Sequence, residues 1–381
     1  LPIDLIMFSS RLMHGNRFLW GREGTVLRGA IACRNLSSAK QLKVTFYDAR
    51  PYWTKYFDEY KAAFNADIKY VNTKLSVDTA ILAKGSDVAC IFVNDTANAD
   101  ELKALHNEGV RMLALRCAGF NNVDLAAAQD LGISVARVPA YSPHAVAEFA
   151  LTLLMALNRK VARAYSRTRT GNFSLSGLVG WDVHGKTVGV IGTGKIGSIF
   201  ARIMVGMGCQ VLCEDAYENP ELTSLPNLRY VGLDELLAES DVISMHAPLN
   251  KSTEHLINDE TISAMKDGVI IINTSRGKLI DTACLIKGLK SGKIGGAGLD
   301  VYEGESKYFF QDRSDENLED EKLLRLLSFS NVIVTSHQSF LTAEALRNIA
   351  SCTMENIHEC FVDGKTMRAM TNHCFPSSIE D

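Results

Sequence analysis

The fold of this 381-residue chain can be read first from KTVGVIGTGKIG, residues 186–197. Gly192, Gly194 and Gly197 have the spacing GxGxxG, an apolar run precedes them, and the helix-like SIFARIMVGMG follows. In such a strand–loop–helix unit, the first glycine makes the tight turn and the third allows close helix packing. The second lets the backbone approach a pyrophosphate, which unpaired N–H groups at the helix start would hold. The stretch therefore predicts a Rossmann-type site for a dinucleotide.

The next strand indicates which dinucleotide is bound. QVLCED (210–215) ends in two acids, and Asp215 lies 18 residues after Gly197. A carboxylate at this position accepts hydrogen bonds from ribose hydroxyls and repels a 2′-phosphate. The pattern favours NAD(H) over NADP(H), although the same residue could simply be a solvated acid at a strand end.

Strands alternate with helices on both sides of this unit, which predicts an α/β fold with parallel sheets. A long apolar helix is expected at 143–163, after Ser142 as its N-cap. The strands expected before that helix are 44–49, 68–71, 88–93, 111–116 and 132–138, with helices near 52–64, 76–83 and 101–109. The strands expected after it are 187–191, 210–213, 241–245, 268–272, 294–298 and 331–335.

The order of these elements predicts two βα domains. A helix near 342–361 comes after the second sheet is complete, so it could return to pack on the first domain. We therefore expect a discontinuous, flavodoxin-like substrate domain made of residues 43–141 and 338–376. A Rossmann-type NAD-binding domain, residues 142–337, would be inserted in it.

Composition excludes several classes of protein. Hydrophobic residues make up 46% and charged residues 22% of the chain, which are globular proportions, and the net charge of −4 argues against a nucleic-acid groove. The longest apolar stretch, 145–157, contains Glu148 and is too short to cross a bilayer. The nine cysteines form no CxxC pair, so we expect reduced thiols and no metal site. No nucleic-acid or membrane partner is expected.

The first 42 residues differ from the rest. They carry six basic and two acidic residues, whereas the remainder carries 34 basic and 42 acidic ones. An Arg-rich, acid-poor, serine-containing leader is typical of an organelle transit peptide. We expect a plastid or, alternatively, a mitochondrial location; if the leader is a cloning remnant with a disordered tail, the location would be cytoplasmic.

Three segments at predicted strand ends offer groups for reducing a 2-oxo acid. Such a substrate needs a cation for its carboxylate, a proton donor for its ketone oxygen, and a partner that orients the donor. INTSRG (272–277) ends a predicted strand and places Arg276 at the carboxyl edge of the sheet, and His337 follows the last strand of the second sheet. Glu303 and Glu305 lie in LDVYEGE (299–305). Taken singly, each could be an ordinary surface or structural residue.

Together these segments resemble a known family. RCAGFNNVD (116–124), RVPAYSP (137–143), AVAEFA (145–150), VIGTGKIG (190–197), NTSRG (273–277), DVYEGE (300–305) and HQSFLTAEAL (337–346) occur in the order typical of D-isomer-specific 2-hydroxyacid dehydrogenases. The resemblance covers about residues 43–376 and is strongest to the NAD-dependent D-lactate dehydrogenases. Two features depart from the family pattern: the leader, and Gln338–Ser339 after the histidine instead of Thr–Ala.

The resemblance implies roles for individual residues. Arg276 would bind the substrate carboxylate, His337 would be the acid and base, and Glu305 would orient His337. Cofactor contacts are implied at Gly192, Gly194, Lys195, Ile196, Gly197, Asp215, Ala247, Pro248, Thr274, Arg276 and Asp300. Substrate contacts are implied at Phe92, Ala118, Gly119, Tyr141, Arg276 and His337. A homodimer or higher homo-oligomer is the family expectation.

The activity implied is NADH-dependent reduction of pyruvate to D-lactate, with the proton supplied by His337. The alternatives are reduction of another 2-oxo acid, such as glyoxylate, hydroxypyruvate or a branched acid, and a non-catalytic NADH-sensing module. Phosphoglycerate is a poorer fit, since no extra basic cluster is evident near 116–121.

Overall fold

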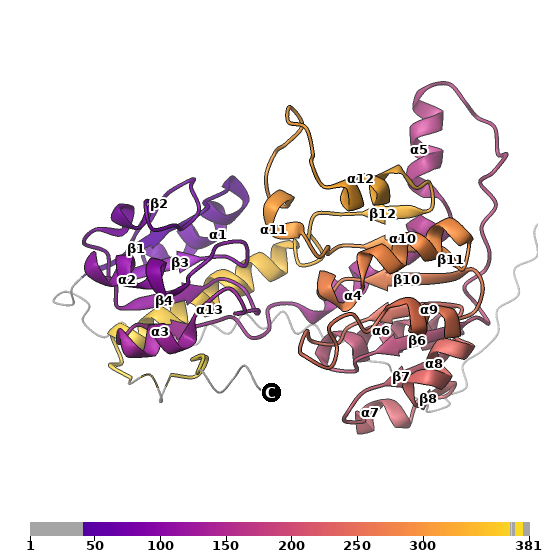
Figure 1. Cartoon of the computed structure of the whole chain (residues 1–381). Coiled ribbons are helices and arrows are strands. Elements are labelled where there is room, and N and C mark those ends of the chain that lie inside the picture. Colours follow the sequence, from indigo (N-terminus) through magenta and orange to yellow (C-terminus); the bar gives the residue numbers. More distant parts are fainter. Residues whose placement is uncertain (1–40, 366, 368–369, 376–381) are drawn as a thin grey trace, which may run out of the picture. The chain divides into compact units, whose positions relative to one another are not determined.

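The structure, a computed structural model, describes residues 41–365, 367 and 370–375, and these contain two parallel sheets (Figure 1). The predicted leader, except for its last two residues, lies outside the described residues, and Leu42 already belongs to the first strand. The residues from Leu42 onward form one compact unit.

The first sheet has the strand order β2-β1-β3-β4-β5, which is the flavodoxin-like order. Its central strands are buried apolar runs, as expected when helices cover both faces of a parallel sheet. The strands are β1 Leu42–Phe46, β2 Ala66–Tyr70, β3 Val88–Ile91, β4 Met112–Leu115 and β5 Ser134–Ala136. The helices are α1 Pro51–Lys61, η2 Ala80–Ala83, α2 Ala99–Asn107 and α3 Leu125–Asp130.

The second sheet has the order β12-β11-β10-β9-β6-β7-β8, and all of its neighbours are parallel. This is the doubly wound dinucleotide-binding order, in which the chain reverses direction beside the first strand of the domain, here β6. The strands are β6 Thr187–Ile191, β7 Gln210–Glu214, β8 Leu228–Tyr230, β9 Val242–Met245, β10 Val269–Asn273, β11 Ile294–Leu299 and β12 Val332–Val334.

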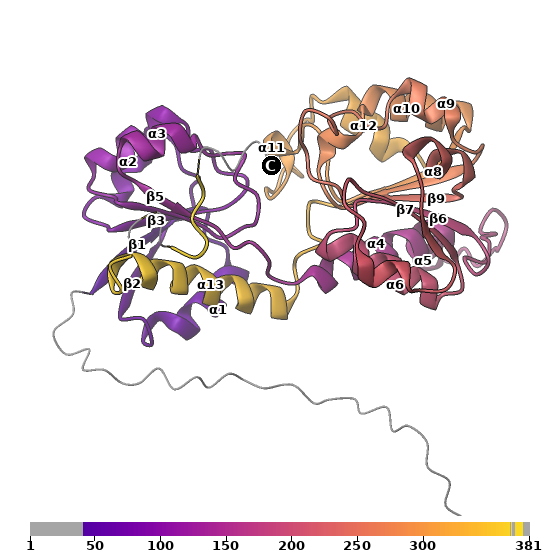
Figure 2. The same cartoon turned by 90° about the horizontal axis from the view of Figure 1, so that it is seen from below.

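Helices cover both faces of the second sheet (Figure 2). On one face lie α4 (Pro143–Asn158) and α6 (Lys195–Gly206), which pack on each other. On the other face lie α8 Leu233–Glu239, α9 Asp259–Ala264, α10 Thr282–Ser291 and α12 Glu321–Ser328. Short elements complete this part: α5 Val161–Arg169, α7 Pro220–Thr223, η3 Gly277–Leu279 and α11 Glu305–Tyr308.

The last helix, α13 (Ala343–Phe361), packs against α1 and β4 of the first sheet. Ile349 and Met354 join the core around that sheet, and His373 pairs with Ala136 at its edge. The chain therefore returns to its first sheet after completing the second, as the order of elements suggested. The domain boundaries themselves stay a prediction.

Two local predictions were wrong, and one strand was not predicted. The helix expected at 76–83 is only η2, and the helix expected at 143–163 is two helices, because Lys160 has a left-handed backbone with φ of 52°. The strand β8 has one buried residue in three, so it carried too little apolar pattern to be predicted. No helix in the described part of the chain is both long and apolar enough to cross a membrane.

Candidate active site

The glycine loop has the geometry that a dinucleotide requires. A side chain at Gly192, whose φ is 88°, would strike the backbone of Ala247 at 2.6 Å, and one at Gly197 would strike the backbone of Gly192. A side chain at Gly194 would meet nothing within 4 Å. Gly194 is also the N-cap of α6 and offers no side-chain cap to its free N–H groups. The loop is therefore tightly packed at Gly192 and Gly197 and open at Gly194, where a pyrophosphate would bind.

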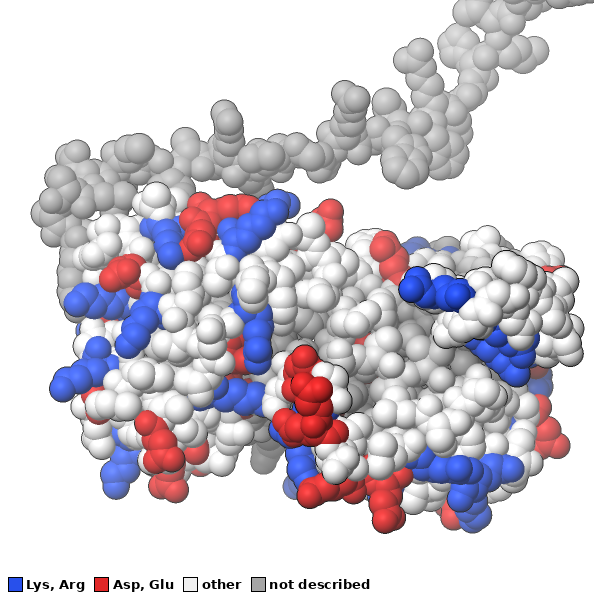
Figure 3. Space-filling model, turned by 90° about the horizontal axis from the view of Figure 1, so that it is seen from above, with Lys and Arg blue, Asp and Glu red and all other residues white. Residues whose placement is uncertain are grey.

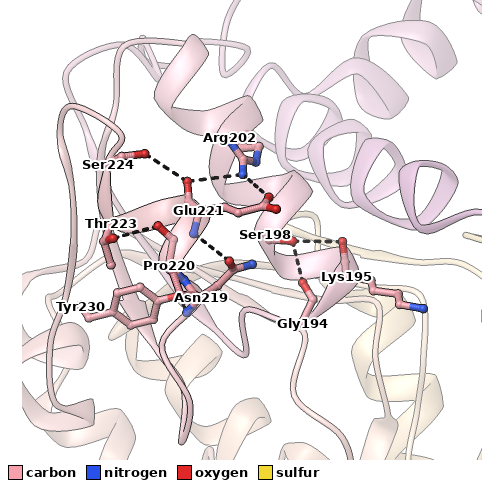
Figure 4. Close-up of polar contacts among 10 residues, drawn as sticks. All are labelled: Gly194, Lys195, Ser198, Arg202, Asn219, Pro220, Glu221, Thr223, Ser224 and Tyr230. Carbon is pink, nitrogen blue, oxygen red and sulfur yellow. Dashed lines mark hydrogen bonds and ion pairs between the residues drawn. The ribbon is translucent and has the colours of Figure 1, made fainter.

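Lys195, in the first turn of α6, forms no ion pair with the described residues. Ser198 donates its hydroxyl back to the carbonyl of Gly194 at 2.8 Å, while the Lys195 side chain makes no contact with the other residues drawn in Figure 4. On the neighbouring α7, Glu221 pairs with Arg202 at 2.9 Å, so that acid is neutralised. Lys195 and Ile196 line a small cavity together with Ala118.

Asp215 lies directly after β7, as predicted for a ribose-binding acid. Its Oδ2 accepts hydrogen bonds from the backbone N–H of Thr193 at 2.6 Å and from the Thr193 hydroxyl at 3.1 Å. The hydroxyl of Tyr230 in turn donates to the Thr193 hydroxyl at 2.9 Å. The carboxylate is therefore fixed against the glycine loop, while Oδ1 accepts one hydrogen bond, from Tyr217 N–H, and retains free lone pairs.

Residues that follow the strands β9 and β10 would complete the cofactor site. Thr274 is buried, lines the main cavity, and its hydroxyl has no hydrogen-bond partner within the described chain. A buried hydroxyl without a partner in the protein can be satisfied by a bound ligand. Ala247 accepts a hydrogen bond from Ser275 at 2.6 Å, and Pro248 is exposed beside it. These residues fit a bound dinucleotide.

A cavity of about 160 Å³ lies next to this cofactor site. It brings together residues from both sheets that the sequence resemblance had implied as substrate contacts: Phe92, Ala118, Gly119, Tyr141, Arg276 and His337. Burial raises the pKa of Tyr141 to about 12, so its hydroxyl stays protonated at neutral pH. The cavity wall thus includes the guanidinium of Arg276, the imidazole of His337 and the neutral hydroxyl of Tyr141, together with apolar side chains.

Arg276 has the freedom that a substrate-binding cation needs. Its guanidinium donates to the carbonyl of Ser275 at 2.8 Å and lies against the backbone of Gly119, where an added side chain would be 2.7 Å from Nη2. It forms no ion pair with a carboxylate of the described residues. The buried side chain of Asn273 fixes the loop by donating to the Arg276 carbonyl at 2.9 Å. The cation is held in place but not neutralised.

His337 and Glu305 form a hydrogen-bonded pair in this cavity's wall. Nδ1 of His337 lies 2.8 Å from Oε1 of Glu305, and Oε2 accepts the N–H of Tyr302 at 2.9 Å. Nε2 of His337 has no partner among the described residues. The other acid of the motif, Glu303, pairs instead with His255 at 2.8 Å. Of the two acids the sequence offered, Glu305 is the one placed to orient the histidine.

A second histidine, His246, also lines the cavity, and sequence reasoning missed it. It follows the end of β9, the same kind of position that singled out His337. Its Nε2 lies 2.9 Å from the Ser244 hydroxyl, and no carboxylate contacts it in the described structure. Burial lowers its pKa to about 3, so at neutral pH it has no proton to give as an acid.

Asp300, implied as a cofactor contact, is fully buried beneath the His337 loop. Its carboxylate accepts the hydroxyl of Thr335 at 2.6 Å and the backbone N–H groups of Gln338 and Ser339, each at 2.8 Å. Because Gln338 and Ser339 contribute backbone donors, their departure from the usual Thr–Ala leaves this arrangement intact.

Arg116 is a second residue that the sequence analysis did not single out. It is fully buried, lines the cavity, and lies 4.2 Å from the ring of Phe46 and 5.2 Å from that of Phe92. Its donors reach the carbonyls of Cys90 and Asp48 at 3.3 to 3.4 Å, and its Nε has no partner. The visible signal was a charged residue directly after the apolar strand MLAL.

Comparison with known proteins agrees with this geometry. Residues 151–339 match the family description "D-isomer specific 2-hydroxyacid dehydrogenase, NAD binding domain". The chain is 47% identical to D-lactate dehydrogenase of Escherichia coli over 83% of its own length and 96% of the relative's. A structure titled "Identification of the pyruvate reductase of Chlamydomonas reinhardtii" is 46% identical, has a TM-score of 0.82, and is matched over 86% of this chain and 98% of that one.

A D-isomer specific 2-hydroxyacid dehydrogenase from Lactobacillus delbrueckii ssp. bulgaricus, solved in complex with NAD, is 32% identical with a TM-score of 0.72, over 87% of this chain and 100% of that one. The chain belongs to the D-isomer-specific 2-hydroxyacid dehydrogenases. It is an NAD-dependent oxidoreductase that acts on small 2-hydroxy and 2-oxo acids.

Proposed function

We propose that this enzyme reduces pyruvate to D-lactate and that His337 is its acid and base. The observation that carries the proposal is the pair of His337 with Glu305 in one cavity with the unpaired Arg276. NADH, when bound, supplies a hydride to the carbonyl carbon of the 2-oxo acid. As negative charge develops on the ketone oxygen, His337 donates its Nε2 proton to that oxygen.

The other two side chains make that transfer possible. The planar guanidinium of Arg276 holds the substrate carboxylate through two parallel hydrogen bonds. Glu305 accepts the Nδ1–H of His337, which orients the ring and leaves Nε2 free to act on the substrate. In the reverse direction, neutral His337 takes the hydroxyl proton of D-lactate.

Cavity size and lining support pyruvate over larger or more polar acids. A volume of about 160 Å³ is close to that of engineered cavities of ~150 Å³ that hold one benzene molecule. Phe92, Phe340 and Ile349 line it with apolar surface, which suits a methyl group better than the hydroxyl of hydroxypyruvate.

The experiment that tests this proposal is NADH-linked reduction of a panel of 2-oxo acids, with chiral analysis of the product. Pyruvate should give the highest kcat/KM and yield D-lactate. A higher value for glyoxylate, hydroxypyruvate or a branched acid would reassign the substrate. His337→Gln should abolish turnover while NADH still binds, and full turnover in that variant would refute the role of His337.

We also propose that the enzyme is a homodimer. The apolar residues of α4 pack inside their own chain. The exposed apolar surface lies instead on α5 and the segment after it, where Tyr165, Phe173 and Leu175 are exposed and α5 has no buried residue. In Figure 3, basic side chains stand beside uncharged surface at the end where α5 lies. Analytical ultracentrifugation should give a dimer that Tyr165→Asp weakens, and a monomeric wild type would refute it.

For residues 1–42, we propose import into a plastid or mitochondrion. A fluorescent reporter fused behind them should enter one of these organelles, and a cytosolic reporter would refute the proposal.

A further inference from the structure

The aromatic segment YFF, residues 308–310, is not explained by the proposed chemistry. It begins at Tyr308, the last residue of α11, the helix that starts at Glu305. Phe309 is buried in the core around the second sheet. Phe310 packs against that core and also against the core around the first sheet.

The backbone at Phe310 is strained. Its φ is 65°, a left-handed conformation that an aromatic residue rarely adopts. Such strain persists only where the surrounding structure enforces it, and it clusters at functional sites. The left-handed residue turns the chain after Phe309, so two consecutive rings pack against different parts of the molecule.

The ring of Phe310 lies against two residues of the cavity wall. Its centroid is 5.8 Å from that of His337, with the planes inclined by 38°, and 5.4 Å from that of Phe92, in an edge-to-face arrangement. Phe310 does not itself line the cavity, whereas His337 and Phe92 do. It therefore supports the wall from behind.

A second contact adds to the orientation of His337 because one hydrogen bond constrains only one edge of the imidazole ring. The bond from Nδ1 to Glu305 fixes one point of the imidazole. The Phe310 ring supplies a second contact on a different part of it. Two contacts define the direction of Nε2, and proton transfer depends steeply on that direction.

We propose that Phe310 is a positioning residue that holds the His337 imidazole and the Phe92 ring in their productive orientations. The proposal rests on the proposed role of His337 as acid and base. Phe310 touches neither substrate nor cofactor, so its effect should fall on kcat and leave the affinity for NADH unchanged.

The experiment compares Phe310→Gly, Phe310→Ala and Phe310→Tyr. Glycine removes the ring and relieves the backbone strain, alanine removes the ring and keeps the strain, and tyrosine keeps the ring. We expect kcat for pyruvate to fall about tenfold to a hundredfold in both the glycine and the alanine variants. The tyrosine variant should retain most of the wild-type kcat.

Stability and cofactor affinity separate a positioning role from a structural one. The melting temperature of Phe310→Gly should exceed that of Phe310→Ala, and both should bind NADH as wild type does in a fluorescence titration. Asn227→Gly is the matched control, because Asn227 also has a positive φ, 60°, but lies before β8, outside the cavity wall. It should leave kcat unchanged.

Two results would overturn the proposal. If kcat in Phe310→Gly equals that of wild type, neither the ring nor the backbone strain at Phe310 contributes to catalysis. If the glycine and alanine variants lose NADH binding, the segment is merely structural. Failure of the proposed role of His337 gives a different result. In that case His337→Gln would keep its turnover, whatever the Phe310 variants show.

Discussion

Oε1 of Glu305 lies 2.8 Å from Nδ1 of His337, although the two residues belong to different loops of the second sheet. The second oxygen of Glu305 is held by the N–H of Tyr302. The carboxylate is thus anchored at one end and orients the imidazole with the other. This pair makes the first prediction possible.

Glu305→Gln should lower kcat for pyruvate reduction by roughly 10²-fold, within the range of general acid–base contributions. The amide keeps the shape of the side chain, but a neutral acceptor binds the Nδ1–H of His337 more weakly than a carboxylate does, so the ring is held less firmly. Steady-state kinetics with pyruvate will check this, and a fluorescence titration should show unchanged affinity for NADH. A Glu305→Gln enzyme with the wild-type kcat would contradict the assignment.

Arg276→Lys should lower kcat/KM for pyruvate by about 10- to 100-fold, because an ammonium cannot reproduce a bidentate guanidinium contact. The affinity for oxamate, a carboxylate inhibitor, should fall in parallel. Arg229→Lys is a suitable control, since Arg229 forms an exposed ion pair with Glu239 away from the cavity. An Arg276→Lys enzyme with unaltered KM and kcat would show that the carboxylate binds elsewhere.

Asp300→Asn tests whether the buried Asp300 carboxylate stabilises the loop that carries His337 or contacts the cofactor. An amide nitrogen in place of one oxygen would face an N–H or O–H donor, so we expect a loss of about 1–3 kcal/mol in the free energy of unfolding. Urea denaturation measures that loss. kcat should fall with it, because the loop carries His337. A variant of normal stability with weakened NADH binding would instead favour a cofactor contact alone.

The lowered pKa of His246 predicts that the folded enzyme loses stability in acid. Its pKa is about 3 in the folded enzyme and near 6.5 in the unfolded chain. The unfolded chain therefore takes up a proton as pH falls below 6.5, while the folded enzyme does not. Stability should decrease by up to about 1.4 kcal/mol per pH unit in that window, down to pH 3. His246→Gln should show a shallower decrease in urea denaturation; an identical slope would contradict the prediction.

The glycine loop, the strand after it and most elements were predictable because their signals are local. Period and turn chemistry are set by neighbouring residues. Prediction failed where the signal was short, as in β8, or where packing broke a continuous pattern, as at Lys160.

The sequence by itself determined the chemical inventory: a dinucleotide loop, an arginine, a histidine and two acids at strand ends. Tertiary structure decided which of them act together. It placed Glu305, as the family resemblance implied, against His337 and placed Glu303 against His255. It also brought His246 and Arg116 into the cavity wall and the Asp300 carboxylate under the His337 loop. The physical reason is that these contacts join residues far apart in the chain, and only packing of the two sheets and their helices fixes such distances.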